Sequence, residues 1–147
     1  MSRAVEAFNR RLLRARDAMD RGYAEPLDVA ALAAIASISE AHFIRSFRTA
    51  FGETPHRYLQ RRRVERSMFL LRETEQSVTD ICFTVGFTSV GTFSRTFREI
   101  VGESPSEYRI GHGPMIVPNC YQMVATRPVV AAGRFSSFGE AVAARAQ

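Results

Sequence analysis

The hydrophobic positions of the chain recur mainly at helical spacing, and the alternation typical of strands is nearly absent. A first helix is predicted over roughly residues 2–21, with one broad apolar face made by Val5, Phe8, Leu12, Leu13 and Met19. Gly22 is expected to end this helix, and Pro26 to lie in the first turn of the next. The second helix, near 27–36, has an apolar side formed by Leu27, Ala31, Leu32 and Ile35.

A third helix is expected to begin after Ser39, a good N-cap residue, and to run to about Phe51. Phe43, Phe47 and Phe51 recur at every fourth position and are predicted to face inward. Gly52 then ends this helix. A longer helix follows over about 55–72, and its predicted buried residues are Tyr58, Leu59, Val64, Met68 and Leu71.

The second half of the chain repeats this plan. The twenty residues that begin at Ser39 and the twenty that begin at Ser89 agree at nine positions without a gap. A short helix after Ser77 comes first, with Val78, Ile81, Cys82 and Val85 at helical spacing. The helix after Ser89 has Phe93, Phe97 and Val101 on its inner side, and Ser104-Pro105 starts a last short turn.

Two short helices joined by a tight turn, with a polar and basic second helix, are typical of a helix-turn-helix. The fold predicted is therefore all-α, with about seven helices in a domain over 1–110. Two helix-turn-helix subdomains, about 27–51 and 77–101, are joined by a central linker helix, about 55–72. The segment 111–147 has several prolines and is predicted to be an irregular tail, whose last residues could form a short terminal helix.

Charge favours a nucleic-acid partner. The net charge is +5, and all twenty residues of the Lys and Arg type are arginine. Between Ser39 and Arg66 the sequence has seven arginines and only three glutamates. Such a local excess is how a phosphate-binding surface is often recognised in a sequence, although a solvated helix face is the commoner cause. At 147 residues and 46 % hydrophobic content the chain is long enough for one globular domain. No apolar run approaches the ~18–20 residues of a membrane span, and a signal peptide is missing, so a cytoplasmic protein without a membrane partner is expected.

Catalytic and metal chemistry find little support. His42, His56 and His112 are far apart, and neither an acid–base pair nor a nucleophile motif surrounds them. Cys82 and Cys120 lack zinc-ligand spacing. We therefore expect no enzyme activity, no metal site and no cofactor.

The residues between the phenylalanines are the candidates for DNA contact. In a helix-turn-helix the second helix lies in the major groove, where an arginine can bind guanine O6 and N7. Arg45 and Arg95 hold the same place in the two repeats, as do Arg48 and Arg98. One of each pair is expected to contact a base and the other a phosphate, and the sequence does not decide which. Arg61 and Arg62 of the linker helix could lie along phosphates.

The duplication itself suggests a monomer that reaches two grooves. Two motifs in one chain can enter major-groove segments one helical turn, ~34 Å, apart without dimerisation. The linker helix of about 18 residues would be about 27 Å long, enough to hold the two motifs apart.

The chain resembles the DNA-binding domain of the AraC/XylS family of bacterial transcription regulators over about Arg11 to Arg109. The most specific segments are YLQRRRVERSMFLL and SVTDICFTVGFTSVGTFSRTFREIVGESPSEYR. This resemblance implies a seven-helix fold of two subdomains, with DNA as the partner. Members of the family are mostly activators that also contact RNA polymerase, so a polymerase contact is expected here as well. It implies base or backbone contacts from the two recognition helices, with their caps, at Ser39, Ala41, His42, Ile44, Arg45, Arg48, Ser89, Val90, Gly91, Thr92 and Arg95.

The sequence departs from the family pattern at several places. Ser37 stands where the family often has a turn glycine, so a strained or altered turn is expected. Ile44, Val90 and Gly91 stand where polar base-reading residues are common. No effector domain precedes Arg11, so a stand-alone regulator without a small-molecule effector is expected.

Two alternatives to a DNA-binding regulator stay open. A protein-interaction adaptor that contacts RNA polymerase or another regulator would explain the apolar Ile44 and Val90. A small-molecule sensor could use the tail and the first helix. Steep salt dependence of DNA affinity would favour the regulator over the adaptor.

Overall fold

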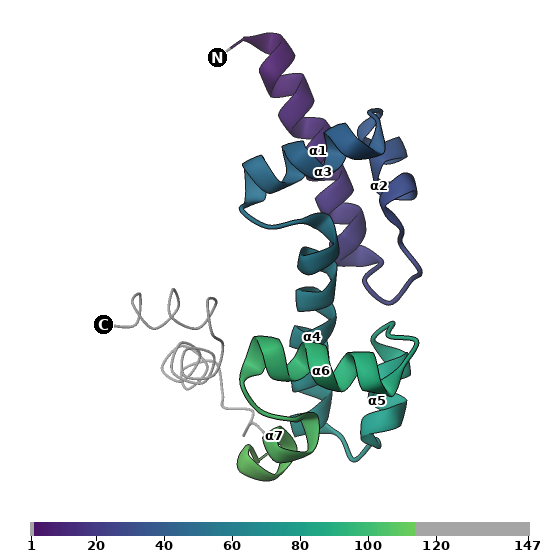
Figure 1. Ribbon diagram of the computed structural model, residues 1–147, viewed down its shortest axis with the longest axis vertical. Helices are drawn as coiled ribbons and strands as arrows, with labels where there is room; N and C mark the ends of the chain where they lie inside the picture. Colours follow the sequence, from purple (N-terminus) through teal and green to yellow (C-terminus); the bar gives the residue numbers. More distant parts are fainter. Residues whose placement is uncertain (1, 114–147) are drawn as a thin grey trace, which may run out of the picture. The chain divides into compact units, whose positions relative to one another are not determined.

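The computed structural model describes residues 2–113, and within this range every element of regular secondary structure is an α-helix (Figure 1). The helices are α1 (Arg3–Arg21), α2 (Val29–Ala36), α3 (Glu40–Phe51), α4 (Pro55–Glu73), α5 (Val78–Thr84), α6 (Val90–Val101) and α7 (Pro105–Gly111). The predicted all-α fold is thus confirmed, with seven helices in this range. The predictions about a tail and a terminal helix, from residue 114 onward, lie outside the described residues. None of the helices in the described range is long and apolar enough to cross a membrane.

The chain divides into two compact units. Among the described residues, unit 1 holds 2–65 together with Thr84–Gly86, and unit 2 holds Arg66–Phe83 and 87–113. The boundary falls inside α4, so the linker helix supplies its first half to unit 1 and its second half to unit 2. Each unit contains one of the two predicted recognition helices, α3 or α6.

Side-chain caps start the helices of unit 1 at the positions that the sequence favours. The hydroxyl of Ser39 accepts a hydrogen bond from the backbone N–H of His42, at 3.3 Å. One helix start differs from the prediction, because Asp28 caps α2 by accepting from Ala31 N–H at 2.7 Å. Pro26 and Leu27 therefore lie before the helix, and the expected role of Pro26 in its first turn is wrong.

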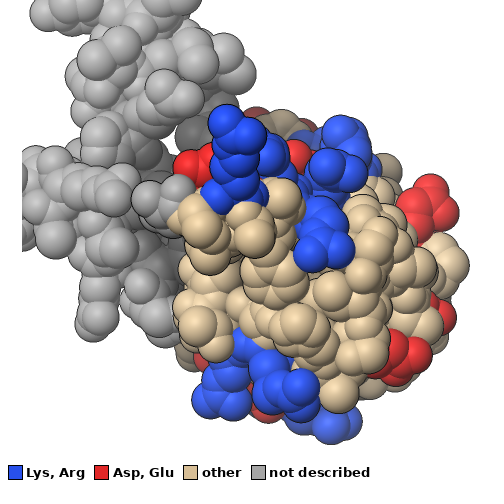
Figure 2. Space-filling view, turned by 90° about the horizontal axis from the view of Figure 1, so that it is seen from above, with Lys and Arg blue, Asp and Glu red and all other residues tan. Residues whose placement is uncertain are grey.

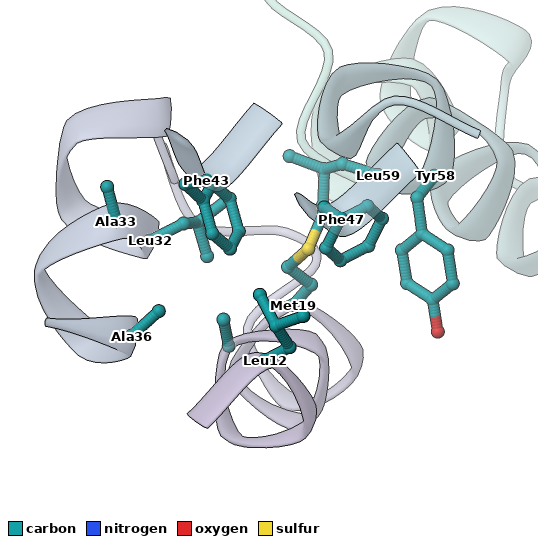
Figure 3. Close-up of a cluster of buried hydrophobic side chains, with 10 residues drawn as sticks. Leu12, Met19, Leu32, Ala33, Ala36, Phe43, Phe47, Tyr58 and Leu59 are labelled. Atoms are coloured by element: carbon teal, nitrogen blue, oxygen red, sulfur yellow. The ribbon is translucent and has the colours of Figure 1, made fainter. Parts of the chain in front are cut away.

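The core of unit 1 collects side chains from α1, α2, α3 and α4 (Figure 3). Leu12 and Met19 of α1 meet Phe43 and Phe47 of α3, and Leu32 of α2 closes the cluster. The remaining members are Ala15, Ala33, Ala36, Tyr58 and Leu59. This cluster holds the inner face of α3 and leaves its outer face to solvent.

Several residues predicted to face inward are exposed instead. Val5 and Leu13 of α1 and Ile35 and Ala31 of α2 all lie at the surface. Residues 2–7 are exposed throughout, because α1 extends past the helices that pack on it (Figure 1). Within residues 2–113, nothing therefore covers the apolar face of its first turns. In α2 the buried stripe is Leu32, Ala33 and Ala36, and Ile35 falls to one side of it.

The core of unit 2 is built around a row of aromatic rings. Phe87, Phe93, Phe97 and Tyr108 follow one another with ring centroids 5.2, 5.8 and 5.6 Å apart. Phe97 and Tyr108 meet edge to face at 5.6 Å, as do their counterparts Phe47 and Tyr58 in unit 1, also at 5.6 Å. The sequence repeat is therefore a repeat of packing as well, because the second Phe of each recognition helix packs on the Tyr of the next helix.

The two helix-turn-helix motifs differ in the turn between their helices. In the first motif Ser37 has φ 57° and ψ 43°, and Ile38 N–H donates to the carbonyl of Ala33 at 3.1 Å. In the second, Gly86 has φ 103°, and Phe87 N–H donates to the carbonyl of Cys82 at 3.1 Å. Ser37 of the first turn thus corresponds to Gly86 of the second, which follows it by 49 residues. The caps Ser39 and Ser89 are 50 residues apart. The second turn is one residue longer, and the left-handed conformation falls on a serine in the first.

Candidate nucleic-acid interface

The outer side of α3 presents an exposed stripe of four residues. Ala41, Ile44, Arg45 and Arg48 are spaced by three or four positions, which places them on one face of the helix; we call them the α3 stripe. All four are exposed, as is the neighbouring His42. The buried Phe43 and Phe47 fix the orientation of this face, because they hold the opposite side of α3 in the core.

His42 contributes to a groove between α1 and α3. Its ring stacks on Phe8 with centroids 5.4 Å apart and planes 21° from parallel, and the guanidinium of Arg11 lies 5.4 Å from the same Phe8 ring. The groove has a volume of about 410 Å³ and is lined by Phe8, Asn9, Leu12, His42, Arg45, Ser46, Thr49 and Ala50. A contact residue predicted for α3 is therefore supported by an aromatic side chain of α1, which the sequence did not indicate.

The outer side of α6 carries the matching stripe in unit 2. Gly91, Ser94, Arg95 and Arg98 stand 50 positions after the members of the α3 stripe, and we call them the α6 stripe. Together with Glu99 they line a hollow of about 430 Å³. The α6 helix begins at Val90, where the hydroxyl of Ser89 accepts from Thr92 N–H at 3.3 Å.

The predicted contact residues of α6 lie at its surface with one partial exception. Ser89, Gly91, Thr92, Arg95 and Arg98 are exposed, and Val90 is half-buried. Ser94 was not among the predicted contacts, although it lies in the α6 stripe. Aligning the two repeats position by position would have found it, because it is the counterpart of Ile44.

The arginines of the linker helix are engaged inside unit 1. Arg61 forms ion pairs with Glu53 at 2.6 Å and with Glu65 at 2.8 Å, and its side chain is only 15 % exposed. Arg62 pairs with Glu65 at 2.8 Å and with Asp20 at 3.0 Å. The structure thus gives both side chains carboxylate partners, whereas the sequence predicts phosphate contacts for them.

Burial governs the pKa values in this part of unit 1. It raises the pKa of Glu65 above the usual range of a glutamate, although Arg61 and Arg62 beside it act in the opposite direction. Burial also lowers the pKa of Arg63, which donates to the carbonyls of Tyr23 at 2.6 Å and Glu25 at 2.9 Å. Arg63 thus connects α4 to the loop after α1, which is a structural role.

The arginines on one face of the protein do not form one continuous basic surface. On the face that Figure 2 shows, they lie in separate groups with wide stretches of uncharged surface between them. Within residues 2–113, no group of three or more His, Cys, Asp and Glu side chains could hold a metal ion. An exposed basic stripe on a rigidly held helix, present twice, is the main chemical feature of the described surface.

Comparison with known proteins agrees with this arrangement. A family model described as a helix-turn-helix domain matches residues 32–110. An uncharacterised helix-turn-helix transcriptional regulator of Haemophilus influenzae is 40 % identical over 78 residues, which are 53 % of this chain and 26 % of that protein. The probable transcriptional regulator LumQ of Photobacterium leiognathi is 31 % identical over 83 residues, which are 56 % of this chain and 34 % of that protein. The chain thus spans about a quarter to a third of the length of these curated relatives.

Solved structures show the same fold. The DNA-binding domain of the transcriptional factor AdpA, crystallised with a target DNA, matches with a TM-score of 0.66 and 32 % identity, over 69 % of this chain and 91 % of that one. A transcriptional regulator with an AraC-type DNA-binding domain from Chromobacterium violaceum matches with a TM-score of 0.64 and 29 % identity, over 69 % and 91 % of the two chains. Because the family model covers more than half of the chain and the match to AdpA covers nearly all of that domain, the chain belongs to the AraC-type family of helix-turn-helix domains, a family of transcription-factor domains and not of enzymes.

Proposed function

We propose that this protein regulates transcription by binding a specific double-stranded DNA site as a monomer, with α3 and α6 in two adjacent segments of the major groove. The observation that carries the proposal is the duplicated pair of exposed arginines, Arg45 and Arg48 on α3 and Arg95 and Arg98 on α6. A helical bundle needs repeated apolar positions for its core, but it does not need repeated arginines on its outer side. The relative whose domain was crystallised with its target DNA supports the same function.

The chemistry of the two stripes suits the major groove. An arginine at a base edge can donate two hydrogen bonds to guanine O6 and N7, and a second arginine one turn away can neutralise a phosphate. The phenylalanine spine under each stripe keeps the helix from rotating, so the guanidinium groups approach the DNA from a defined direction. The N-terminal ends of α3 and α6 also present backbone N–H groups that favour an anion.

A contact with RNA polymerase and a role in activation fit this proposal, and such a regulator would act in the cytoplasm, where the chromosome lies. The second candidate is an adaptor that binds other proteins and has little DNA affinity of its own. The exposed Ile44 favours it, because an apolar side chain at the centre of a contact surface is typical of protein interfaces.

The test is a selection of genomic DNA fragments by the purified protein, followed by affinity measurements at two salt concentrations. Arg45→Ala and Arg95→Ala are each expected to lose roughly 1–3 kcal/mol of binding free energy and to relax specificity in different halves of the site. Arg14→Ala removes the same charge from the exposed side of α1 and serves as the matched control. Sedimentation of the complex should give one chain per site.

Other results would redirect the proposal. Loss of specificity with Arg45→Ala alone would leave α6 as a clamp on the DNA backbone. Absence of any enriched fragment, together with negligible affinity at low salt, would contradict DNA binding and favour the adaptor.

A further inference from the structure

The two stripes carry the same pair of arginines but differ at their two uncharged positions. Arg45 and Arg48 match Arg95 and Arg98, but Ala41 corresponds to Gly91 and Ile44 to Ser94. On α3, two apolar side chains therefore flank the arginines. On α6, the corresponding positions are a glycine, which has no side chain, and a serine, which has a hydroxyl group.

Ile44 is well placed to contact a base. Its side chain is 37 % exposed, and it lies three residues after Ala41 and four before Arg48, beside Arg45. A β-branched side chain has few rotamers in a helix, so Ile44 loses little conformational entropy on being held against a partner.

The major groove offers one apolar group, the C5 methyl of thymine. Cytosine has only a hydrogen at that position, and the purines present donors and acceptors instead. An isoleucine beside an arginine matches a thymine next to a guanine, because the methyl would bury against the isoleucine while the arginine donates to O6 and N7. From this we infer that Ile44, assisted by Ala41, recognises a thymine methyl group in the half-site under α3. The inference rests on the proposed function.

The α6 stripe is expected to behave differently. Ser94 can donate or accept a hydrogen bond, and the hollow at Gly91 leaves room beside Arg95. Neither residue offers an apolar surface for a methyl group. The two stripes should therefore differ, because only the α3 stripe offers an apolar side chain to a thymine methyl group.

A single exposed isoleucine is ordinary on a protein surface, so a matched control is needed. Ile35 of α2 is 38 % exposed, nearly the same as Ile44, and does not belong to either stripe. Ile35→Ala removes the same atoms from unit 1 and should leave DNA binding unchanged. Ser94→Ala changes the position of the α6 stripe that corresponds to Ile44, and it serves only to test whether the response to the methyl group belongs to α3.

The experiment replaces each thymine of the selected site, one at a time, by deoxyuridine. This removes only the methyl group and keeps the O4 acceptor and base pairing. Affinity for the wild-type protein should fall about fourfold at one or two thymines of the α3 half, which is the factor that burial of one methyl group supports. Any effect of deoxyuridine in the α6 half should be independent of Ile44 and unchanged in Ile44→Ala.

A double-mutant cycle then assigns the effect to Ile44. Ile44→Ala should weaken binding to the natural site, and deoxyuridine at the sensitive position should cause no further loss with this variant. Ile35→Ala and Ser94→Ala should keep the full sensitivity to deoxyuridine in the α3 half.

The failure of this inference and that of the proposed function are distinguishable. Specific binding that is indifferent to every deoxyuridine in the α3 half, or a methyl effect in that half that persists in Ile44→Ala, would overturn the inference and leave the function intact. Absence of specific DNA binding at low salt would refute both.

Discussion

The hydroxyl of Tyr58 donates a 2.7 Å hydrogen bond to Oδ1 of Asp20, which joins α4 to α1 within unit 1. The two residues are 38 positions apart in the chain. Burial raises the pKa of Tyr58 to about 12, and the hydrogen bond to Asp20 and the charge of that carboxylate add to the effect. The ring of Tyr58 also packs on Phe47, so the bond secures the residue that supports the recognition helix.

Removal of this hydroxyl should lower the stability of unit 1. Tyr58→Phe keeps the ring packing and is expected to reduce the free energy of unfolding by about 1 kcal/mol, the usual contribution of one hydrogen bond. Urea denaturation measures the change. Combination with Asp20→Ala should show coupling between the two sites, and strictly additive losses would mean that the bond contributes nothing.

The same bond predicts a pH dependence at alkaline pH. An unfolded tyrosine ionises near pH 10 and folded Tyr58 near 12, so between these values the folded state holds a proton that the unfolded state has lost. The stabilisation is therefore complete below about pH 10 and disappears as pH rises toward 12. The difference in unfolding free energy between wild type and Tyr58→Phe should shrink over that range, and a constant difference would contradict the assignment.

Ser37→Gly should stabilise the protein. Ser37 is the one non-glycine residue with positive φ among residues 2–113, and a left-handed conformation costs an L-residue roughly 1–2 kcal/mol. Part of the gain is offset by the greater freedom of glycine in the unfolded chain, which leaves about 0.5–1 kcal/mol. The midpoint of urea denaturation should rise without a change of slope. Ala34→Gly, within the regular part of α2, is the control and should destabilise by about 1 kcal/mol.

Gly86→Ala should destabilise for two separate reasons. Gly86 has φ 103°, and a Cβ there would stand 2.9 Å from Nε of Arg63 and 3.0 Å from the Cα and carbonyl oxygen of Ala24. Gly52 has φ 80° but nothing within 4 Å of the added Cβ, so Gly52→Ala measures the conformational cost alone, about 1 kcal/mol. Thermal unfolding of both variants should show the larger loss for Gly86→Ala. Equal losses would mean that the neighbours of Gly86 move aside freely.

Arg61→Gln and Arg48→Gln should separate structural from DNA-contacting arginines. Arg61 forms ion pairs with Glu53 and Glu65, so its replacement leaves these partly buried carboxylates without that positive charge. The free energy of unfolding should fall by about 1–3 kcal/mol. Arg48 is exposed, and its loss should leave stability nearly unchanged while reducing the slope of log affinity against log salt by about 1.

The salt dependence of binding, measured where both variants are folded, decides between these roles. A reduced slope for Arg61→Gln would show that this residue contacts phosphate despite its ion pairs, as the sequence suggests.

Much of the architecture could be predicted from local pattern. The caps Ser39 and Ser89, the phenylalanines every fourth residue and the glycines after α3 and α6 each act through their own backbone or the nearest turn of helix. Such interactions depend on residues three or four positions away, so the order of the chain is enough to determine them. The duplicated arginines are likewise visible in the sequence, because the apolar face predicts the side on which they lie.

Other features were decided only when distant helices packed together. Val5, Leu13 and Ile35 fit an apolar helix face but are exposed, because burial depends on which helices cover that face.

Long-range partners are the clearest case. The stacking of His42 on Phe8, and the pairing of Arg62 with Asp20, join residues more than thirty positions apart. Sequence alone determined most of the helices, the caps Ser39 and Ser89 and the outward arginine pairs, because these follow from short-range geometry. Tertiary structure decided which charged side chains neutralise one another and which stay exposed, because a long arginine side chain pairs with whichever carboxylate the packing brings within its reach.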